Sequence, residues 1–314
     1  MRALVLGDDG PRVVEDWPEP RPAAGEALVE VRLAGVCGTD LELCAGYKGG
    51  FRGVLGHEFV GEVIEAADRA WVGRRVTASI NLGCGVCPEC REHGPEHCPA
   101  RRVIGILGRD GVFAERVALP LANLHLVPDD LADEEAVFAE PLAAALHVLD
   151  LHPAGRVAVI GPGRLGLLAA QVLAPVAAVT VLGRRPESLE PARRLGLDAG
   201  LVDEAESDSF DQAVEASGAP AGLAAALRLV RPRGVVVLKS TYAAGAALDF
   251  SPAVVKELVL HGSRCGRIAD AIEALAARRV RVRELVSGEF ALHDGLAALA
   301  AAGAPGALKV LLRA

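Results

Sequence analysis

The sequence predicts an α/β protein with a β-rich part followed by a doubly wound parallel-sheet part. Up to about Val127 the chain consists largely of short segments of strand character, such as the alternating segment 27–33. From Arg156 the pattern changes, because a continuous apolar strand leads through a glycine-rich turn into the helical run 167–173. Strands and helices then alternate, which is typical of a parallel sheet covered by helices.

The composition is that of an ordinary globular protein of about two domains. The chain has 314 residues, of which 51% are hydrophobic and 24% are charged. A net charge of −8 and an aromatic content of 4% argue against nucleic acids and anionic membrane surfaces as partners. The start of the sequence lacks the apolar segment of a signal peptide, and no apolar run is long enough to cross a bilayer. We therefore expect a cytoplasmic protein.

A cysteine, a histidine and carboxylates crowd into the glycine-rich stretch 35–61. Cys37 and Thr39 lie near its start, and His57 is followed directly by Glu58. Cysteine, histidine and carboxylates are the side chains that bind zinc, and Thr39 is close enough to Cys37 to pass a proton from whatever the metal binds. A single cysteine or histidine is more often simply packed in a core. The combination nevertheless favours a catalytic zinc site.

Four of the seven cysteines lie within residues 84–98, with the spacing C-x2-C-x2-C-x7-C. Four thiolates can close a tetrahedral zinc site with no open position, which is a structural site. Disulfides are rare in the cytosol, and the spacing does not match the ferredoxin patterns of iron–sulfur proteins. The candidate ligands of this cysteine lobe are Cys84, Cys87, Cys90 and Cys98. Together with the catalytic site, the lobe leads us to expect about two zinc ions per chain.

Residues 129–147 are predicted to be helical, with acidic residues in the first turn. Within them, Glu140 is a carboxylate in an otherwise apolar run and precedes Pro141. A buried, unpaired carboxylate is costly, so a metal partner would explain this residue. Taken alone, a surface glutamate at the start of a helix is the simpler interpretation.

The glycine-rich turn after residues 157–160 has the form G-x-G-x-x-G between a strand and a helix. This context is typical of dinucleotide binding, because the glycines allow a tight turn and let a pyrophosphate approach the start of the helix. The candidate cofactor-binding residues of this turn are Gly161, Gly163, Arg164, Leu165 and Gly166.

The residues after the second strand of this part, 179–182, bear on the choice of cofactor. NAD-binding proteins usually carry an acidic residue about 20 residues past the glycines, where it binds the ribose hydroxyl. Here Arg184 and Arg185 stand in that place. Guanidinium groups pair well with phosphate, so the sequence favours NADP over NAD. The alternative is that both arginines are solvated surface charges.

The remaining segments follow the same alternation and then return to strands. Helical character is predicted for 187–195, 222–230 and 269–277, and strand character for 213–216 and 234–238. From about Val286 the chain reads as strand, helix and strand, and we expect this tail to fold back onto the first domain. Its segments are 289–292, 294–302 and 309–312.

The motifs, in this order along essentially the whole chain, resemble the zinc-dependent medium-chain dehydrogenase/reductase family, in its alcohol dehydrogenase-like branch of polyol, sorbitol and threonine dehydrogenases. The resemblance implies a GroES-like catalytic domain, 1–145 and 287–314, that contains the cysteine lobe, and a Rossmann domain, 146–286. It also implies zinc ligation by Cys37 and His57, with Glu58 and Glu140 sharing or exchanging the remaining positions with water and substrate.

The same resemblance implies a hydride transfer between a secondary alcohol, or its carbonyl, and a nicotinamide cofactor. Zinc would act as a Lewis acid and Thr39 would begin the proton relay; where many members continue that relay with a histidine, this chain has Glu42. Two alternatives stay open: a non-catalytic dinucleotide sensor, and a zinc-free quinone or enoyl reductase on the same fold.

The expected partners are a small alcohol, polyol or sugar and a second copy of the chain, in a dimer or tetramer. The sequence does not identify the residues that contact the substrate. Candidates are Tyr47, Lys48, Arg52 and Lys239, and the alternative for each is an ordinary surface residue. The strands around 234–238 and 258–261 are candidates for pairing between subunits.

Overall fold

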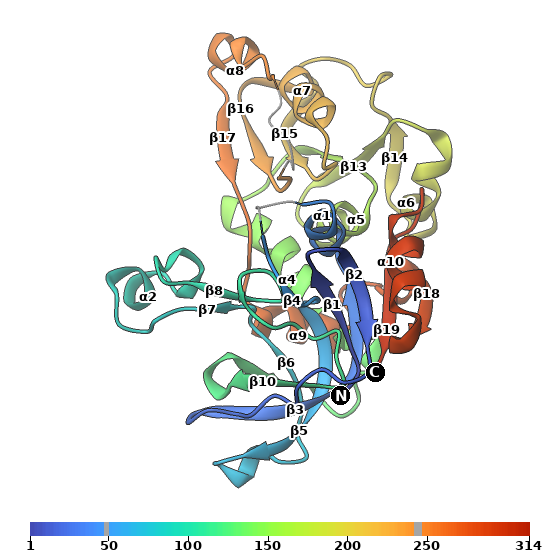
Figure 1. The fold of residues 1–314 in the computed structure, drawn as a ribbon. Helices are drawn as coiled ribbons and strands as arrows, with labels where there is room; N and C mark the ends of the chain where they lie inside the picture. Colours follow the sequence, from blue (N-terminus) through green and yellow to red (C-terminus); the bar gives the residue numbers. More distant parts are fainter. Residues whose placement is uncertain (47–49, 242–246) are drawn as a thin grey trace. The chain divides into compact units, whose positions relative to one another are not determined.

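The computed structural model describes residues 1–46, 50–241 and 247–314, and the chain forms two compact units (Figure 1). Tyr47 and Lys48 lie outside the described residues. In the described part of the chain, no helix has the length and apolar character needed to cross a membrane. The first unit comprises Met1–Glu140, Leu275–Ala277 and Val286–Ala314, and the second comprises Pro141–Ala274 and Arg278–Leu285.

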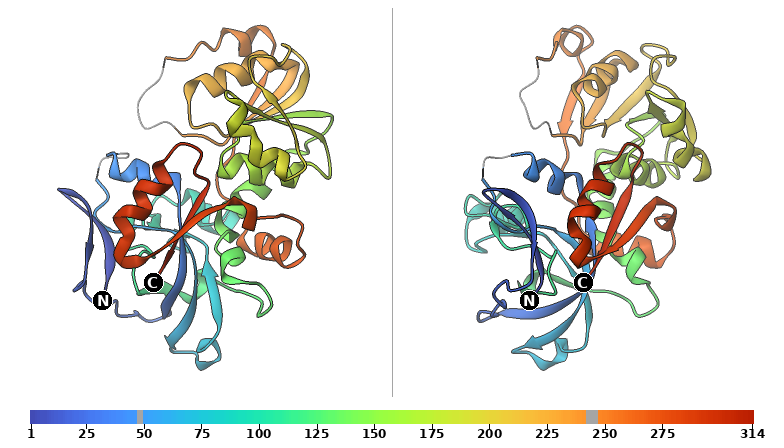
Figure 2. Two further views of the ribbon diagram at one scale, coloured as in Figure 1. Left: turned by 90° about the vertical axis from the view of Figure 1, so that its right-hand side faces the viewer. Right: turned by 45° about the vertical axis from the view of Figure 1, so that its right-hand side comes forward.

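The first unit is organised around one long strand, β3 (Glu26–Val36), whose second half is almost entirely buried. β3 pairs antiparallel with β5 (Glu58–Ala66), β10 (Arg116–Pro120) and β19 (Lys309–Arg313). Figure 2 shows β19, in red, beside the blue β3, so the carboxyl-terminal segment belongs to the sheet of the first unit. The outer strands of this sheet are β6 (Arg75–Ala78), β11 (Leu124–Leu126) and β18 (Val286–Ala291).

Two small sheets and four short helices complete the described part of the first unit. The sheets contain β1 (Ala3–Gly7), β2 (Gly10–Val14) and β4 (Gly53–Val54), and β7 (Asn81–Leu82), β8 (Arg102–Ile104) and β9 (Gly108–Arg109). The helices are α1 (Gly38–Cys44), α2 (Pro88–Glu92), α3 (Asp133–Ala136) and α10 (Gly295–Gly303). A continuous apolar core fills the unit, with Phe59 and Phe113 among its largest fully buried side chains.

The second unit contains a parallel sheet of six described strands in the order β14-β13-β12-β15-β16-β17. This order reverses between β12 and β15, which is the arrangement of the Rossmann fold, and ligands of such sheets bind beyond the carboxyl ends of the strands at this point. The predicted fold class is thus confirmed. The strands are β12 (Arg156–Ile160), β13 (Ala178–Gly183), β14 (Asp198–Leu201), β15 (Phe210–Glu215), β16 (Val230–Leu238) and β17 (Val259–Gly262).

The helices from Ala139 onward match the predicted segments except for α8 (Ser251–Val255), which the sequence pattern did not predict, and for the segment 187–195. The single helix expected over 187–195 is divided into a 3-10 turn, Pro186–Leu189, and a short α6 (Glu190–Arg194). Pro191 explains the division, because a proline is tolerated in the first turn of a helix but not in its interior. The other helices are α4 (Ala139–Leu146), α5 (Arg164–Leu173), α7 (Pro220–Leu229), α8 (Ser251–Val255) and α9 (Ile268–Ala276).

Candidate functional site

The pairing of β3 with β5 brings the residues of the predicted catalytic zinc site together. Gly35 of β3 lies opposite Glu58, the first residue of β5. Cys37 follows the end of β3, and His57 precedes β5, so both side chains lie at the same end of the strand pair. The ligand atoms of Cys37, His57 and Glu58 all lie within 4.8 Å of one another.

Asp40 holds this arrangement together from the short helix α1, where the sequence suggested only turns. Its fully buried carboxylate accepts hydrogen bonds from the main-chain N–H of Cys37 (2.8 Å, to Oδ2) and of Gly56 (3.2 Å, to Oδ1). Oδ1 also lies 3.4 Å from Nδ1 of His57. One carboxylate therefore fixes the backbone on both sides of the metal-ligand group, a role that the sequence analysis did not assign.

The electrostatics of His57 follow from its position beside Asp40. Burial is the largest single influence and lowers the pKa of His57, but the charges and hydrogen bonds of Asp40 and Cys37 together outweigh burial and raise the pKa well above its usual value. The imidazole is 3% exposed. The site therefore favours a positive charge at this point, which a metal cation would also supply.

The three side chains fit a zinc ion by the chemistry of their donor atoms. A thiolate sulfur, an imidazole nitrogen and a carboxylate oxygen form a mixed set that zinc accepts. Oε1 of Glu58 is buried and has no hydrogen-bond partner among the residues that the structure describes, whereas Nδ1 of His57 faces the Asp40 carboxylate. Buried polar atoms without partners are costly, so a ligand at this point would relieve that cost.

Lys309 also belongs to the surroundings of the metal-ligand group. The sequence analysis had predicted only that this lysine lies in a strand. Its ammonium group forms an ion pair with Oε2 of Glu58, and both side chains are 1% exposed. Little in the sequence indicated that Lys309 is buried, because it stands at the start of an apolar strand, where a lysine side chain usually reaches solvent.

Thr39 and Glu140 lie differently with respect to the metal-ligand group. Oγ1 of Thr39 is 3.9 Å from Sγ of Cys37, so its hydroxyl borders the group. Glu140 lies in the first turn of α4, is half-buried and is not one of the three clustered ligands. Glu42 lies on α1 and is half-buried.

The two described candidates for substrate contact are engaged elsewhere. Arg52 is exposed and forms an ion pair with Asp8 at 2.7 Å. In the second unit, Nζ of Lys239 donates to the main-chain carbonyls of Ala144 (2.7 Å) and Arg264 (2.9 Å) and to the hydroxyl of Ser263 (3.1 Å). Lys239 is thus held by hydrogen bonds within the second unit.

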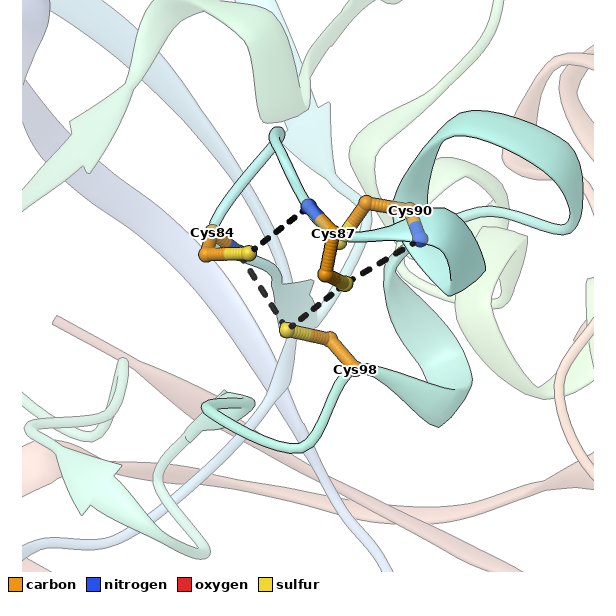
Figure 3. Close-up of side chains that lie close together, drawn as sticks. All are labelled: Cys84, Cys87, Cys90 and Cys98. Atoms are coloured by element: carbon orange, nitrogen blue, oxygen red, sulfur yellow. Dashed lines mark hydrogen bonds between the residues drawn. The ribbon is translucent and has the colours of Figure 1, made fainter.

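The four cysteines of the lobe turn toward one another, as Figure 3 shows, and their sulfurs lie within 4.8 Å of each other. Main-chain N–H groups donate to three of the sulfurs: Cys84 N to Sγ of Cys98, Cys87 N to Sγ of Cys84, and Cys90 N to Sγ of Cys87, each at 3.4 Å. Such donors stabilise thiolates, and main-chain hydrogen bonds lower the pKa of Cys84 to about 6. The lobe is therefore built for a cation held by four sulfurs.

The glycine-rich turn lies between β12 and α5, as predicted. Gly161 has a φ of 105°, and a Cβ at this position would lie 2.6 Å from the Cα of Ser217. Gly163 is the N-cap of α5, and nothing lies within 4 Å of the place where its Cβ would be. Gly166 packs against the carbonyl of Gly161, which leaves no room for a side chain. Main-chain N–H groups at the start of α5 thus remain accessible to an anionic ligand.

Arg184 and Arg185 directly follow β13, the neighbour of β12 in the sheet, and both side chains are exposed. Their place at the carboxyl end of β13 is the edge at which ligands of such sheets bind. Arg164 and Leu165 are the first two residues of α5, and both are half-buried.

Comparisons with known proteins identify the family. Residues 23–129 match the model of the alcohol dehydrogenase GroES-like domain. The sorbitol dehydrogenase of Halalkalibacterium halodurans is 31% identical, over 99% of this chain and 99% of that protein.

Two solved structures show the same fold over 100% of this chain and 99% of theirs. One is an alcohol dehydrogenase from E. coli in complex with NADH, with a TM-score of 0.91 and 28% identity. The other, described as a zinc-binding dehydrogenase from Sinorhizobium meliloti bound to NADP, has a TM-score of 0.89 and 30% identity. These findings confirm the resemblance that the motifs indicated. The chain therefore belongs to the zinc-type medium-chain alcohol dehydrogenase family, a family of oxidoreductases.

Proposed function

We propose that the chain is an alcohol dehydrogenase that transfers a hydride between a secondary alcohol of a polyol or sugar and NADP. The observation that carries this proposal is the group formed by Cys37, His57 and Glu58, in which Oε1 of Glu58 is buried without a hydrogen-bond partner in the described part of the chain. The names of relatives support the substrate class, because they include a sorbitol dehydrogenase and a D-arabitol-phosphate dehydrogenase.

We propose a zinc ion at Cys37 and His57, with Glu58 and Glu140 as the carboxylates of the site. When bound there, zinc would supply Lewis-acid chemistry to the substrate oxygen. Asp40 fixes the backbone at Cys37 and Gly56 and so orients the ligand group. The hydroxyl of Thr39 borders Cys37 and is suited to accept the proton that the alcohol releases.

A second zinc ion is proposed at Cys84, Cys87, Cys90 and Cys98. Four sulfur ligands leave no open coordination position, so this ion would stabilise the lobe and take no part in the reaction. The lobe has little secondary structure of its own beyond α2 and one 3-10 turn, which suits a segment held by a metal. Free thiols in both clusters suit a reducing compartment, and we place the protein in the cytoplasm.

The second unit would bind the dinucleotide, which supplies the hydride chemistry when bound. The residues of the glycine-rich turn and the start of α5 would receive the pyrophosphate. Arg184 and Arg185 would pair with the additional phosphate of NADP. Solved relatives hold either cofactor, since one is bound to NADH and another to NADP; the two arginines are the basis for proposing NADP here.

We further propose that the chain forms a dimer or tetramer through β17, which lies at the edge of the parallel sheet. An exposed strand edge can pair with a second copy. Apolar side chains close to it in sequence are solvent-exposed, notably Val254 (76%), Val255 (82%) and Val259 (54%). Light scattering should give a multiple of 32.5 kDa for the wild type and a smaller mass for Val255→Glu.

The test of the function is turnover of a panel of polyols, sugars and secondary alcohols with NADP and with NAD. The proposal predicts activity that Cys37→Ala abolishes and that Cys44→Ala leaves intact, because Cys44 lies in the same unit but in neither metal-ligand group. Dinucleotide binding without turnover of any alcohol would favour a sensor. Carbonyl or enoyl reduction that survives both Cys37→Ala and a chelator would favour the zinc-free reductase.

A further inference from the structure

Lys309 is buried to an extent that is unusual for a lysine. Its side chain is 1% exposed, and its ammonium group donates to Oε2 of Glu58 and, at 3.4 Å, to the main-chain carbonyl of Val36. Nζ also lies 5.7 Å from the centre of the Phe138 ring, where a cation is attracted to the aromatic face. Two of these three contacts are directed at the candidate metal site, namely at Glu58 and at the residue before Cys37.

The sheet explains how a lysine 251 positions away reaches Glu58. β3 lies between β5 and β19, and Gly35 of β3 is opposite Glu58 on one side and Leu311 on the other. Because Gly35 has no side chain, the side chains of Glu58 and Lys309 can meet over it. A Cβ on Gly35 would lie 2.7 Å from Oε2 of Glu58 and 3.2 Å from Cδ of Lys309.

The two oxygens of Glu58 therefore have different surroundings. Oε2 is held by Lys309, whereas Oε1 is buried and has no hydrogen-bond partner among the described residues. A carboxylate that is fixed by one oxygen can offer only the other to a metal, and the adjacent positive charge weakens it as a donor. A neutral residue at position 309 would leave both oxygens to the metal.

We propose that Lys309 is a positioning residue that keeps Glu58 a weak, single-oxygen ligand, so that a neutral ligand such as a substrate hydroxyl can compete for the metal. The inference rests on the proposed metal site. Lys309 acts on the metal through its ion pair with Glu58.

The test is binding of imidazole to the cobalt-substituted protein, followed by visible absorption. Imidazole is chosen because it is neutral at pH 8, so loss of the lysine charge does not weaken its binding directly. In Lys309→Met we expect the Kd of imidazole to rise about tenfold, at the lower end of the effects seen when partners of metal ligands are replaced. Unchanged imidazole binding in this variant would overturn the inference.

Lys256→Met is the matched control. Nζ of Lys256 donates to the main-chain carbonyls of Leu227 (2.9 Å) and Val230 (3.2 Å) and pairs with Asp208 at 2.6 Å, all in the second unit. This variant also removes a well-engaged lysine but should bind imidazole as the wild type does. A rise in Kd equal to that of Lys309→Met would show a general loss of structure and would overturn the specific role.

A second pair of variants protects the test if Lys309→Met does not fold. Glu58→Gln and Glu58→Gln/Lys309→Met both lack the carboxylate, and the double variant buries no unpaired charge. If Lys309 acts through Glu58, the two should bind imidazole with equal affinity. A severalfold difference between them would show that Lys309 acts by another route, which contradicts the inference.

Metal content separates failure of this inference from failure of the proposed site. If the wild type takes up cobalt only in the cysteine lobe, its spectrum will not respond to imidazole and the metal site itself is wrong. If it takes up cobalt at both sites and Lys309→Met binds imidazole normally, only the role of Lys309 is wrong.

Discussion

Replacement of Gly35 by alanine should disturb the first unit at the point where Glu58 and Lys309 meet. The new Cβ would lie 2.7 Å from Oε2 of Glu58, 3.2 Å from Cδ of Lys309 and 3.4 Å from Cγ2 of Val137. The first distance is too short for an unstrained contact. Because these side chains are buried, they have little room to move away.

The net effect is a balance of two opposing terms. Overpacking a core costs about 1–3 kcal/mol. Alanine in a strand gains about 0.5–1 kcal/mol over glycine through the entropy of the unfolded chain. We therefore expect Gly35→Ala to lower the free energy of unfolding by about 1–2 kcal/mol and to reduce zinc occupancy at the site that contains Glu58.

The assay is urea unfolding followed by tryptophan fluorescence. The chain has two tryptophans, Trp17 and Trp71, and both belong to the first unit, so the signal reports that unit. Gly288→Ala is the control, because Gly288 lies in β18 of the same sheet and its Cβ would be in ordinary contact, 3.5 Å from Cε2 of Phe290. If Gly35→Ala unfolds at the same urea concentration as the wild type and keeps full zinc content, the space above Gly35 is not as tightly filled as these distances indicate.

Three further predictions concern Asp40, the two arginines after β13, and Asp211. Asp40→Asn should lower zinc content at the Cys37 site while the cysteine lobe stays full, because the charge beside His57 is lost; metal analysis of the purified variant checks this. The double variant Arg184→Ala/Arg185→Ala should weaken NADPH binding about tenfold or more, as loss of charge-assisted contacts implies, and leave NADH binding unchanged in a fluorescence titration. The pKa of Asp211 is lowered, mainly by the hydrogen bond from the main-chain N–H of Arg156. Because the pKa of Asp211 is lower in the folded than in the unfolded state, its charged form stabilises the fold fully above about pH 4, and this stabilisation is lost below that pH. Urea unfolding should therefore show Asp211→Asn to be less stable than the wild type at pH 6. The difference in stability should shrink as the pH falls below about 4.

Much of the fold followed from local patterns in the sequence. The strand, glycine turn and helix around Gly161 are adjacent in the chain, so their periodicity and spacing suffice to predict them. The spacing of the cysteines from Cys84 to Cys98 likewise predicted a group of four sulfurs, because the lobe closes on itself within a few residues of chain. In both cases the residues that act together are near neighbours in sequence.

The parts of the site that depend on distant strands could not be predicted in the same way. Lys309 reaches Glu58 because β3 lies between their strands, and this strand order is a property of the whole sheet. The role of Asp40 depends on a short helix, α1, in which its side chain accepts the N–H of Cys37 and of Gly56. No periodicity reveals such contacts, since they require the register of β3 with β5.

Metal content of the purified protein decides whether the Cys37 group binds zinc. We expect about two zinc ions per chain for the wild type, one for Cys37→Ser and two for Cys44→Ser. Cys44 is a suitable control because burial raises the pKa of its thiol to about 11, which keeps it protonated. One zinc ion in the wild type, with no further loss in Cys37→Ser, would mean that only the cysteine lobe binds metal and that the proposed site at Cys37 and His57 does not exist.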